Sequence, residues 1–171
     1  EHDKLDILAV CAANVIDGIE KKRFSYTFNG VMLGGEAIDK GGMQYCVPFS
    51  IYRREFLIQH ELSFYPGIFH EDSEFSPRSY YYAQRVGFSN EIVYLVTINP
   101  NSITRTINYM RALDYLKVAI SIHDFYRINT MKDIHSAFFH NHVSLMINNA
   151  MAILVNPKGN CTTRMNVVYS F

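Results

Sequence analysis

The pattern of apolar and polar positions predicts short strands and helices in alternation, followed by two long helices. Strands are expected where the chain is apolar and β-branched or alternates polar with aromatic residues, at 5–16, 23–28, 45–52 and 91–98. Helical spacing or a helix-opening signal is found from Gly34 and at 53–62, 73–86, 109–128 and 131–155. In the third of these helices, Pro77 favours a regular start near Ser76. The order predicts an α/β chain.

Turn signals separate these elements, at Asp17-Gly18, Asn29-Gly30, Gly41-Gly42 and 99–102. The charge run Glu20-Lys21-Lys22-Arg23 is typical of a solvated loop or a sheet edge. No Gly-Lys-Ser/Thr follows the glycines near Gly34, so a phosphate-binding P-loop is excluded. The tail, 164–171, reads either as a last strand or as disordered chain.

Composition narrows the class of protein. The chain has 171 residues, 49% hydrophobic and 19% charged, which is typical of one folded domain rather than a disordered segment. Its formal net charge is zero, so no basic excess indicates a nucleic-acid partner. Three widely spaced cysteines, Cys11, Cys46 and Cys161, form no Cys-x-x-Cys pair, which favours a reducing cytosol over a zinc or disulfide framework.

The most distinctive stretch is acidic and lies between aromatics. Glu71, Asp72 and Glu74 follow His70 closely, with a Pro-Gly turn signal upstream and a predicted helix downstream. One interpretation is structural, because carboxylates stabilise the first turn of a helix. The other is chemical: a carboxylate in an aromatic-walled cleft whose neighbours set its pKa, so that it acts as a general base.

The ordered motifs resemble the second half of family 2 glycosyltransferases of the GT-A fold. The resemblance covers roughly residues 5–107 and rests on Tyr52-Arg53-Arg54-Glu55-Phe56-Leu57, Phe64, Gly67-Ile68, His70-Glu71-Asp72, Phe75, Arg78, Ala83, Tyr94 and Ser102-Ile103-Thr104. It implies a partial GT-A mixed sheet with flanking helices in residues 1–107. Residues 108–171 would form a C-terminal helical extension, where the resemblance is loose.

The resemblance implies transfer of a sugar from a nucleotide-sugar donor to an acceptor hydroxyl, with inversion. Asp72 matches the family's general base, which takes the acceptor proton as the new bond forms. Glu71 would orient or polarise the acceptor. His70 would line the acceptor cleft, although it could equally be a satisfied loop histidine.

Three further residues are assigned to substrate binding. Tyr52 and Arg78 would lie in or under the acceptor site. Arg105 could contact the donor phosphates, and the structural alternative is a solvent-exposed arginine.

The donor half of the family's domain is not recognisable in this chain. No Asp-x-Asp motif occurs, and in the family those carboxylates hold a divalent metal on the donor diphosphate. Mn²⁺ or Mg²⁺ is therefore expected in the full-length enzyme, with no ligands identified here. His135 and His142 could share a helix face, but a metal site there is disfavoured. We expect a fragment that is inactive without an N-terminal nucleotide-binding half.

The expected partners are the nucleotide-sugar donor and a saccharide or lipid-linked acceptor of bacterial polysaccharide biosynthesis. The expected location is cytoplasmic, with peripheral association at the inner face of the membrane as an alternative. The apolar end of the last helix fits a core, a partner face or a peripheral membrane contact. Core or homodimer packing is favoured, because no basic face accompanies it. The alternative function is a non-catalytic binding or dimerisation module of the same fold. An incomplete sheet would also expose an edge, which predicts self-association.

Overall fold

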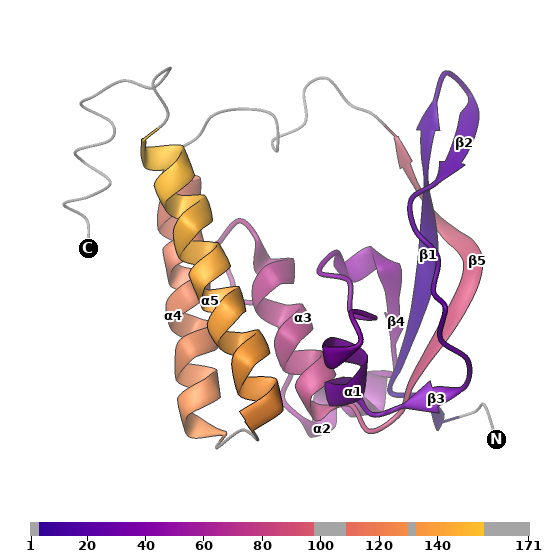
Figure 1. Cartoon of the computed structure of the whole chain (residues 1–171), viewed down its shortest axis with the longest axis horizontal. Helices are drawn as coiled ribbons and strands as arrows, with labels where there is room; N and C mark the ends of the chain where they lie inside the picture. The colour runs from indigo at the N-terminus through magenta and orange to yellow at the C-terminus, as the bar shows by residue number, and fades with distance from the viewer. Residues whose placement is uncertain (1–3, 98–108, 130–132, 156–171) are drawn as a thin grey trace. The chain divides into compact units, whose positions relative to one another are not determined.

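A computed structural model describes residues 4–97, 109–129 and 133–155, with only the backbone at 133 and 134 (Figure 1). The elements run β1 (Ile7–Ile16), β2 (Ile19–Lys22), β3 (Val31–Met32), α1 (Gly34–Asp39), the 3-10 turn η2 (Val47–Phe49), β4 (Ser50–Tyr52), α2 (Arg54–Gln59), α3 (Glu71–Tyr82), β5 (Val86–Thr97), α4 (Met110–Ile128) and α5 (Asp133–Leu154). The predicted α/β class is confirmed.

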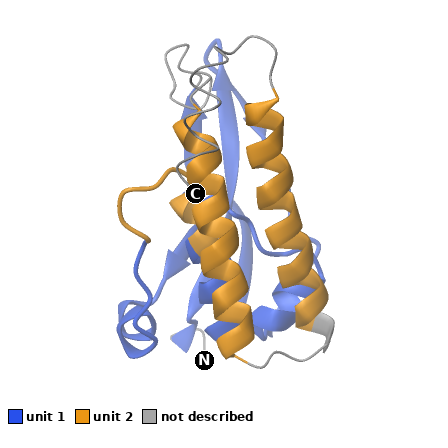
Figure 2. Cartoon of the chain, turned by 90° about the vertical axis from the view of Figure 1, so that its left-hand side faces the viewer, with its two compact units in different colours: residues 1–64, 75–99 blue, residues 65–74, 100–171 orange. Residues whose placement is uncertain are grey.

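The chain divides into two compact units (Figure 2). The first contains Glu1–Phe64 and Phe75–Asn99, and the second contains Tyr65–Glu74 and Pro100–Phe171. The acidic stretch therefore belongs to the unit of the two long helices, although it precedes them by some forty residues along the chain. Helix α3 begins in the second unit and continues in the first.

The sheet of the first unit is mixed and is built around β1. Strand β1 pairs in parallel with β5 and antiparallel with β2 and β4, while β3 pairs antiparallel with the start of β5. Six of the ten residues of β1 are buried, as its continuous apolar run predicts for a central strand. Strand β5 carries two register irregularities against β1, which curl the sheet.

The hairpin after β1 turns at the predicted dipeptide. Asp17 and Gly18 both have positive φ, 51° and 77°, as a two-residue hairpin turn that follows the twist of its strands requires. The return strand β2 is exposed throughout and contains most of the charge run, so it is a charged sheet edge. The prediction of a return strand at 23–28 is wrong, because the hairpin closes earlier.

The segment at 23–28 instead packs its aromatic side chains against the sheet. The side-chain amide of Asn90, at the irregularity of β5, pairs with the N–H and carbonyl of Tyr26, each over 2.8 Å. Tyr26 and Phe28 pack on Phe88 with ring centroids 5.0 Å apart. The alternation of polar and aromatic residues thus satisfies a packed segment without a strand ladder.

Two other predicted strands have different bounds. At 45–52 only β4 is a strand, because Pro48 lies in a 3-10 turn directly before it. The strand predicted at 91–98 is confirmed over 91–97, but it begins earlier, at Val86. Its first part was not predicted because Gly87 and Asn90 interrupt the apolar pattern. Residue 98 and the Asn-Pro turn after it lie outside the described residues.

Helix α3 begins at Glu71, earlier than the predicted start near Ser73 or Ser76. The acidic residues themselves form its first turn, where they complement the helix dipole. Pro77 consequently lies inside the helix, where it has no N–H to donate to the carbonyl of Ser73.

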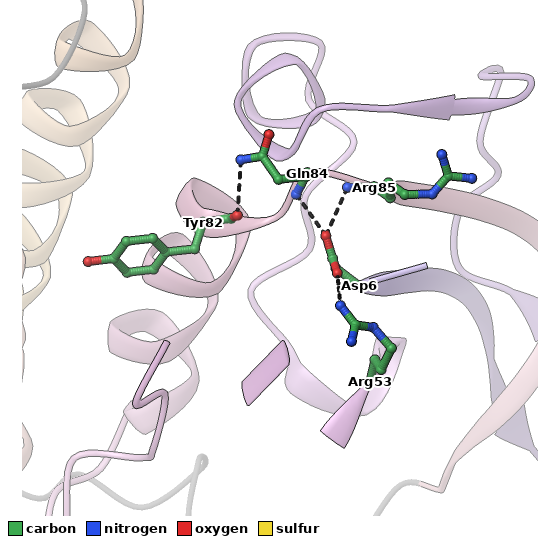
Figure 3. Close-up of polar contacts among 5 residues, drawn as sticks. All are labelled: Asp6, Arg53, Tyr82, Gln84 and Arg85. Carbon is green, nitrogen blue, oxygen red and sulfur yellow. Dashed lines mark hydrogen bonds and ion pairs between the residues drawn. The ribbon is translucent and has the colours of Figure 1, made fainter. Parts of the chain in front are cut away.

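A buried carboxylate ties three segments of the first unit together (Figure 3). One oxygen of Asp6 accepts the backbone N–H groups of Gln84 and Arg85 over 2.8 and 3.0 Å. Its other oxygen accepts a hydrogen bond from the Arg53 guanidinium. The start of β1, the start of α2 and the link from α3 to β5 are therefore held by one side chain.

The two long helices predicted at 109–128 and 131–155 are confirmed as α4 and α5, and they form an antiparallel pair in the second unit. The start of α4 packs on the end of α5 in a cluster of buried residues: Tyr109, Ala112, Leu113 and Ala150. At the other end, Phe125 packs on Phe139 with ring centroids 5.9 Å apart. The apolar end of α5 thus buries Met146 and Ala150, while Leu145 and Met151 stay exposed. None of the described helices combines the length and apolarity needed to cross a membrane.

Candidate functional site

The candidate site is built on the first turn of α3, within the second unit. Asp72 is half-buried there, and its Oδ1 accepts the backbone N–H of Ser73 over 2.8 Å. The Ser73 hydroxyl lies 3.5 Å from the same oxygen. The electrostatics of the carboxyl also include a hydrogen bond from the backbone N–H of Asp72 itself. Both contacts from Ser73 are to Oδ1, so this oxygen is the one that Ser73 orients.

The surroundings make Asp72 a stronger base than an ordinary aspartate. Burial raises the pKa of its carboxyl, and the negative charge of Glu71 adds to the increase. The hydrogen bonds from Ser73 and from the backbone N–H of Asp72 itself lower the pKa and so oppose this increase. A carboxylate whose pKa is raised holds a transferred proton better, which is the property that general-base catalysis uses.

His70 precedes the helix in a strained backbone conformation. Its φ is +67°, in the left-handed region that residues with a side chain rarely adopt. Its ring stacks on Tyr115 of α4, with centroids 3.8 Å apart and an angle of 12° between the planes. Such strain persists only where the surrounding contacts enforce it, and it is common at functional sites.

Arg111 of α4 fixes the protonation of His70. Its Nε and Nη2 lie 3.4 and 3.3 Å from Nε2 of the imidazole. A guanidinium can only donate, so Nε2 accepts and the neutral ring carries its hydrogen on Nδ1. Burial lowers the pKa of His70 and the charge of Arg111 lowers it further, while Glu71 and Asp114 oppose the shift. His70 is accordingly a neutral imidazole at pH 7.

Asp114 of α4 anchors the loop before α3. It is 5% exposed, and its Oδ2 accepts the backbone N–H of Phe69 over 3.1 Å. Its Oδ1 accepts a hydrogen bond from Lys117 over 2.8 Å. The backbone directly before His70 is therefore tied to α4 by a buried, paired carboxylate.

A second anchor joins α4 to the acidic turn. Glu74 is 2% exposed, and its Oε1 accepts a hydrogen bond from the Ser121 hydroxyl over 2.8 Å. Sequence reasoning missed the α4 residues that meet the acidic stretch, namely Arg111, Asp114, Tyr115 and Ser121. The last three lie three, four and ten positions after Arg111, and this helical spacing, which places all four along one side of α4, is the available signal.

The other predicted site residues are Tyr52, Arg78 and Arg105. Tyr52 and Arg78 belong to the first unit. The Tyr52 ring packs edge-on against Phe75 with centroids 5.4 Å apart, and burial raises the pKa of its hydroxyl. Arg78 donates to the carbonyl of Ser63 over 2.9 Å. Arg105 lies outside the described residues, so the substrate roles of all three stay predictions.

No group of three or more His, Cys, Asp or Glu side chains suited to a metal ion occurs among the residues whose placement is described. His135 and His142 are both on α5. His142 is buried, and its Nε2 is hydrogen-bonded to a backbone carbonyl, which assigns it a structural contact.

Comparison with known proteins identifies no family for this chain. A scan against protein-family models finds no match. A search of curated proteins likewise finds no relative.

Proposed function

We propose that this chain is the acceptor-side part of an inverting glycosyltransferase of GT-A fold, and that Asp72 is its general base. The observation that carries the proposal is the state of the Asp72 carboxylate. Its Oδ1 is oriented by the Ser73 N–H over 2.8 Å, and burial together with the charge of Glu71 raises the pKa of the carboxyl. This chemistry occurs at the position that the family resemblance assigns to the base.

In the proposed reaction, the acceptor hydroxyl oxygen attacks the anomeric carbon of the donor sugar. Asp72 takes the hydroxyl proton as this bond forms, and the nucleoside diphosphate leaves from the opposite face, so the configuration inverts. Glu71 and the neutral His70 would orient the acceptor. The donor and its divalent metal would be bound by an N-terminal half, on the cytoplasmic side where nucleotide sugars are available.

The test is a sugar-transfer assay on an N-terminally extended protein. We expect Asp72→Asn to lower kcat about 10²- to 10⁴-fold, the usual contribution of a general base, with donor affinity unchanged. Asp124→Asn is the matched control, because Asp124 is an exposed aspartate of α4 paired only weakly with His123 at 3.6 Å. Transfer retained near the wild-type rate in Asp72→Asn would refute the assignment of the base.

Calorimetric titration with UDP and Mn²⁺ or Mg²⁺ tests whether donor binding requires the N-terminal half. We expect the extended protein to bind and this chain alone not to bind. Binding of UDP by this chain alone would contradict the proposed separation of donor and acceptor functions.

A second candidate is a non-catalytic dimerisation module. It is favoured by apolar residues that stay exposed on α5, such as Leu145 and Met151, and directly after it, at Val155. If the extended protein binds no nucleotide, and sedimentation shows a dimer that Met151→Glu dissociates, this function replaces the enzymatic one.

A further inference from the structure

His142 of α5 is buried beside the candidate base but has no part in the mechanism above. It is 2% exposed, and its Nε2 lies 2.8 Å from the backbone carbonyl oxygen of Ser73. Ser73 is the residue that also donates its N–H to Asp72. A side chain on the last helix is thus joined to the candidate base through a single residue.

Pro77 explains why the Ser73 carbonyl needs a donor from elsewhere. In a regular helix this carbonyl would accept the N–H of the residue four positions later, which here is Pro77. Proline has no N–H, so the carbonyl loses its normal helical partner. Ser73 is half-buried, and leaving its carbonyl without a hydrogen bond would be unfavourable; the imidazole of His142 replaces the missing donor.

The chemistry of the contact defines the state of His142. A carbonyl oxygen can only accept, so Nε2 must carry a hydrogen. Burial lowers the pKa of the ring, which favours the neutral form with that hydrogen on Nε2. The ring is also stacked on Phe138, one turn earlier on α5, with centroids 5.9 Å apart and planes within 5°. The donor is therefore fixed in both orientation and tautomer.

We propose that His142 is a positioning residue for Asp72: by holding the Ser73 carbonyl, it fixes the first turn of α3 and thereby the carboxylate that Ser73 orients. The inference rests on the proposed function for its catalytic consequence. The linkage between His142 and Asp72 is a physical property of the chain itself and can be measured without activity.

The first test is an NMR titration of the Asp72 carboxyl in this chain. In His142→Leu the donor is lost and the turn loosens, which changes both the burial of Asp72 and its hydrogen bonds from Ser73, so its midpoint should move from the wild-type value by about half a pH unit or more. In His142→Gln an amide N–H reaches the position of Nε2, and the midpoint should stay within about 0.2 pH units of wild type. Equal midpoints in all three proteins would overturn the proposal.

Pro77→Ala provides a check that does not depend on one variant being well folded. It restores a backbone N–H for the Ser73 carbonyl, so His142→Leu should shift the Asp72 midpoint less in the Pro77→Ala background than in wild type. Two-bond ¹⁵N–¹H spectra of the wild-type chain should show the hydrogen of His142 on Nε2. Equal shifts in the two backgrounds, or a hydrogen on Nδ1, would contradict the proposed donor.

Catalysis supplies the last readout, in the extended protein. His142→Leu should lower kcat at least about 10-fold while leaving the KM for the donor unchanged, and His142→Gln should restore most of the loss. If Asp72→Asn transfers sugar normally while the NMR shifts appear, the proposed base fails and the positioning by His142 stands. If Asp72→Asn is inactive and the Asp72 midpoint does not respond to His142→Leu, the base stands and the positioning role fails.

Discussion

Replacing Asp6 tests how one carboxylate holds three segments of the first unit (Figure 3). Its side chain is 8% exposed, whereas that of its partner Arg53 is 35% exposed. The ion pair is consequently screened on one side and should stabilise the fold by only about 1 kcal/mol. The two hydrogen bonds from the Gln84 and Arg85 N–H groups to a charged acceptor should contribute more, about 1.5–3 kcal/mol each at full burial.

A series of variants separates these contributions. Asp6→Ala removes every acceptor, but Gln84 and Arg85 are exposed residues, so water partly replaces the lost bonds and we expect a loss of about 2–4 kcal/mol in the free energy of unfolding. Asp6→Asn keeps a carbonyl oxygen for both N–H groups and loses the charge, which should cost about 1–2 kcal/mol. Arg53→Met should cost about 1 kcal/mol.

The assay is equilibrium unfolding in urea, monitored by circular dichroism, with Arg54→Met as the control. Arg54 is the exposed neighbour of Arg53, and its replacement should change the free energy of unfolding by no more than about 0.5 kcal/mol. Equal losses for Asp6→Asn and Asp6→Ala would refute the reasoning, because the backbone hydrogen bonds would then contribute nothing beyond the charge. A loss below that of the control in Asp6→Ala would do the same.

Two further predictions concern packing and pH. Gly34→Ala would place a Cβ 1.8 Å from the backbone oxygen of Tyr80, so the backbone must move, and we expect the free energy of unfolding in urea to fall by about 3 kcal/mol or more. The control is Gly18→Ser, whose Cβ meets no atom within 4 Å although φ stays positive. If Gly18→Ser lost as much stability as Gly34→Ala, the steric explanation would be contradicted. The lowered pKa values of His70 and His142 mean that the unfolded chain binds more protons below about pH 6.5, so their contribution to stability is complete above that pH and is lost as the pH falls. Urea unfolding at pH 7.5 and 5.5 should show this loss in wild type and a smaller one in the double variant His70→Gln/His142→Gln; equal losses would disprove it.

The central elements of the fold could be predicted because one physical pattern governs each of them. Strand β1 is a continuous apolar run because most of its residues are buried. Helices α4 and α5 have apolar residues at helical spacing because these residues pack against each other. The segment at 23–28 could not be assigned in this way. Its alternation of polar and aromatic residues is equally satisfied by a strand and by a packed segment, and a distant amide, that of Asn90, decides between them.

The candidate site shows the same division between local and distant determinants. The acidic turn, His70 and the helix after them were apparent from the sequence, because capping and turn chemistry act over a few residues. The protonation of His70 depends on Arg111, and the backbone before it depends on Asp114. These partners lie more than forty positions away, and no local rule selects them among the polar residues of the chain.

Pro77 is the exception, because the local rule that proline has no N–H to donate predicts a contact between two distant parts of the chain. Because α3 begins at Glu71, Pro77 cannot donate a backbone N–H to the carbonyl of Ser73. That carbonyl must accept a hydrogen bond either from another part of the chain or from water. Ser73 is half-buried, so a donor side chain from another element satisfies the carbonyl where access of water is reduced. His142 meets this requirement at 2.8 Å. The sequence pattern predicted a helix start near Ser76, which would put Pro77 in the first turn, where its missing N–H costs nothing. With that start no donor for the Ser73 carbonyl is required, so the contact with His142 was not predicted.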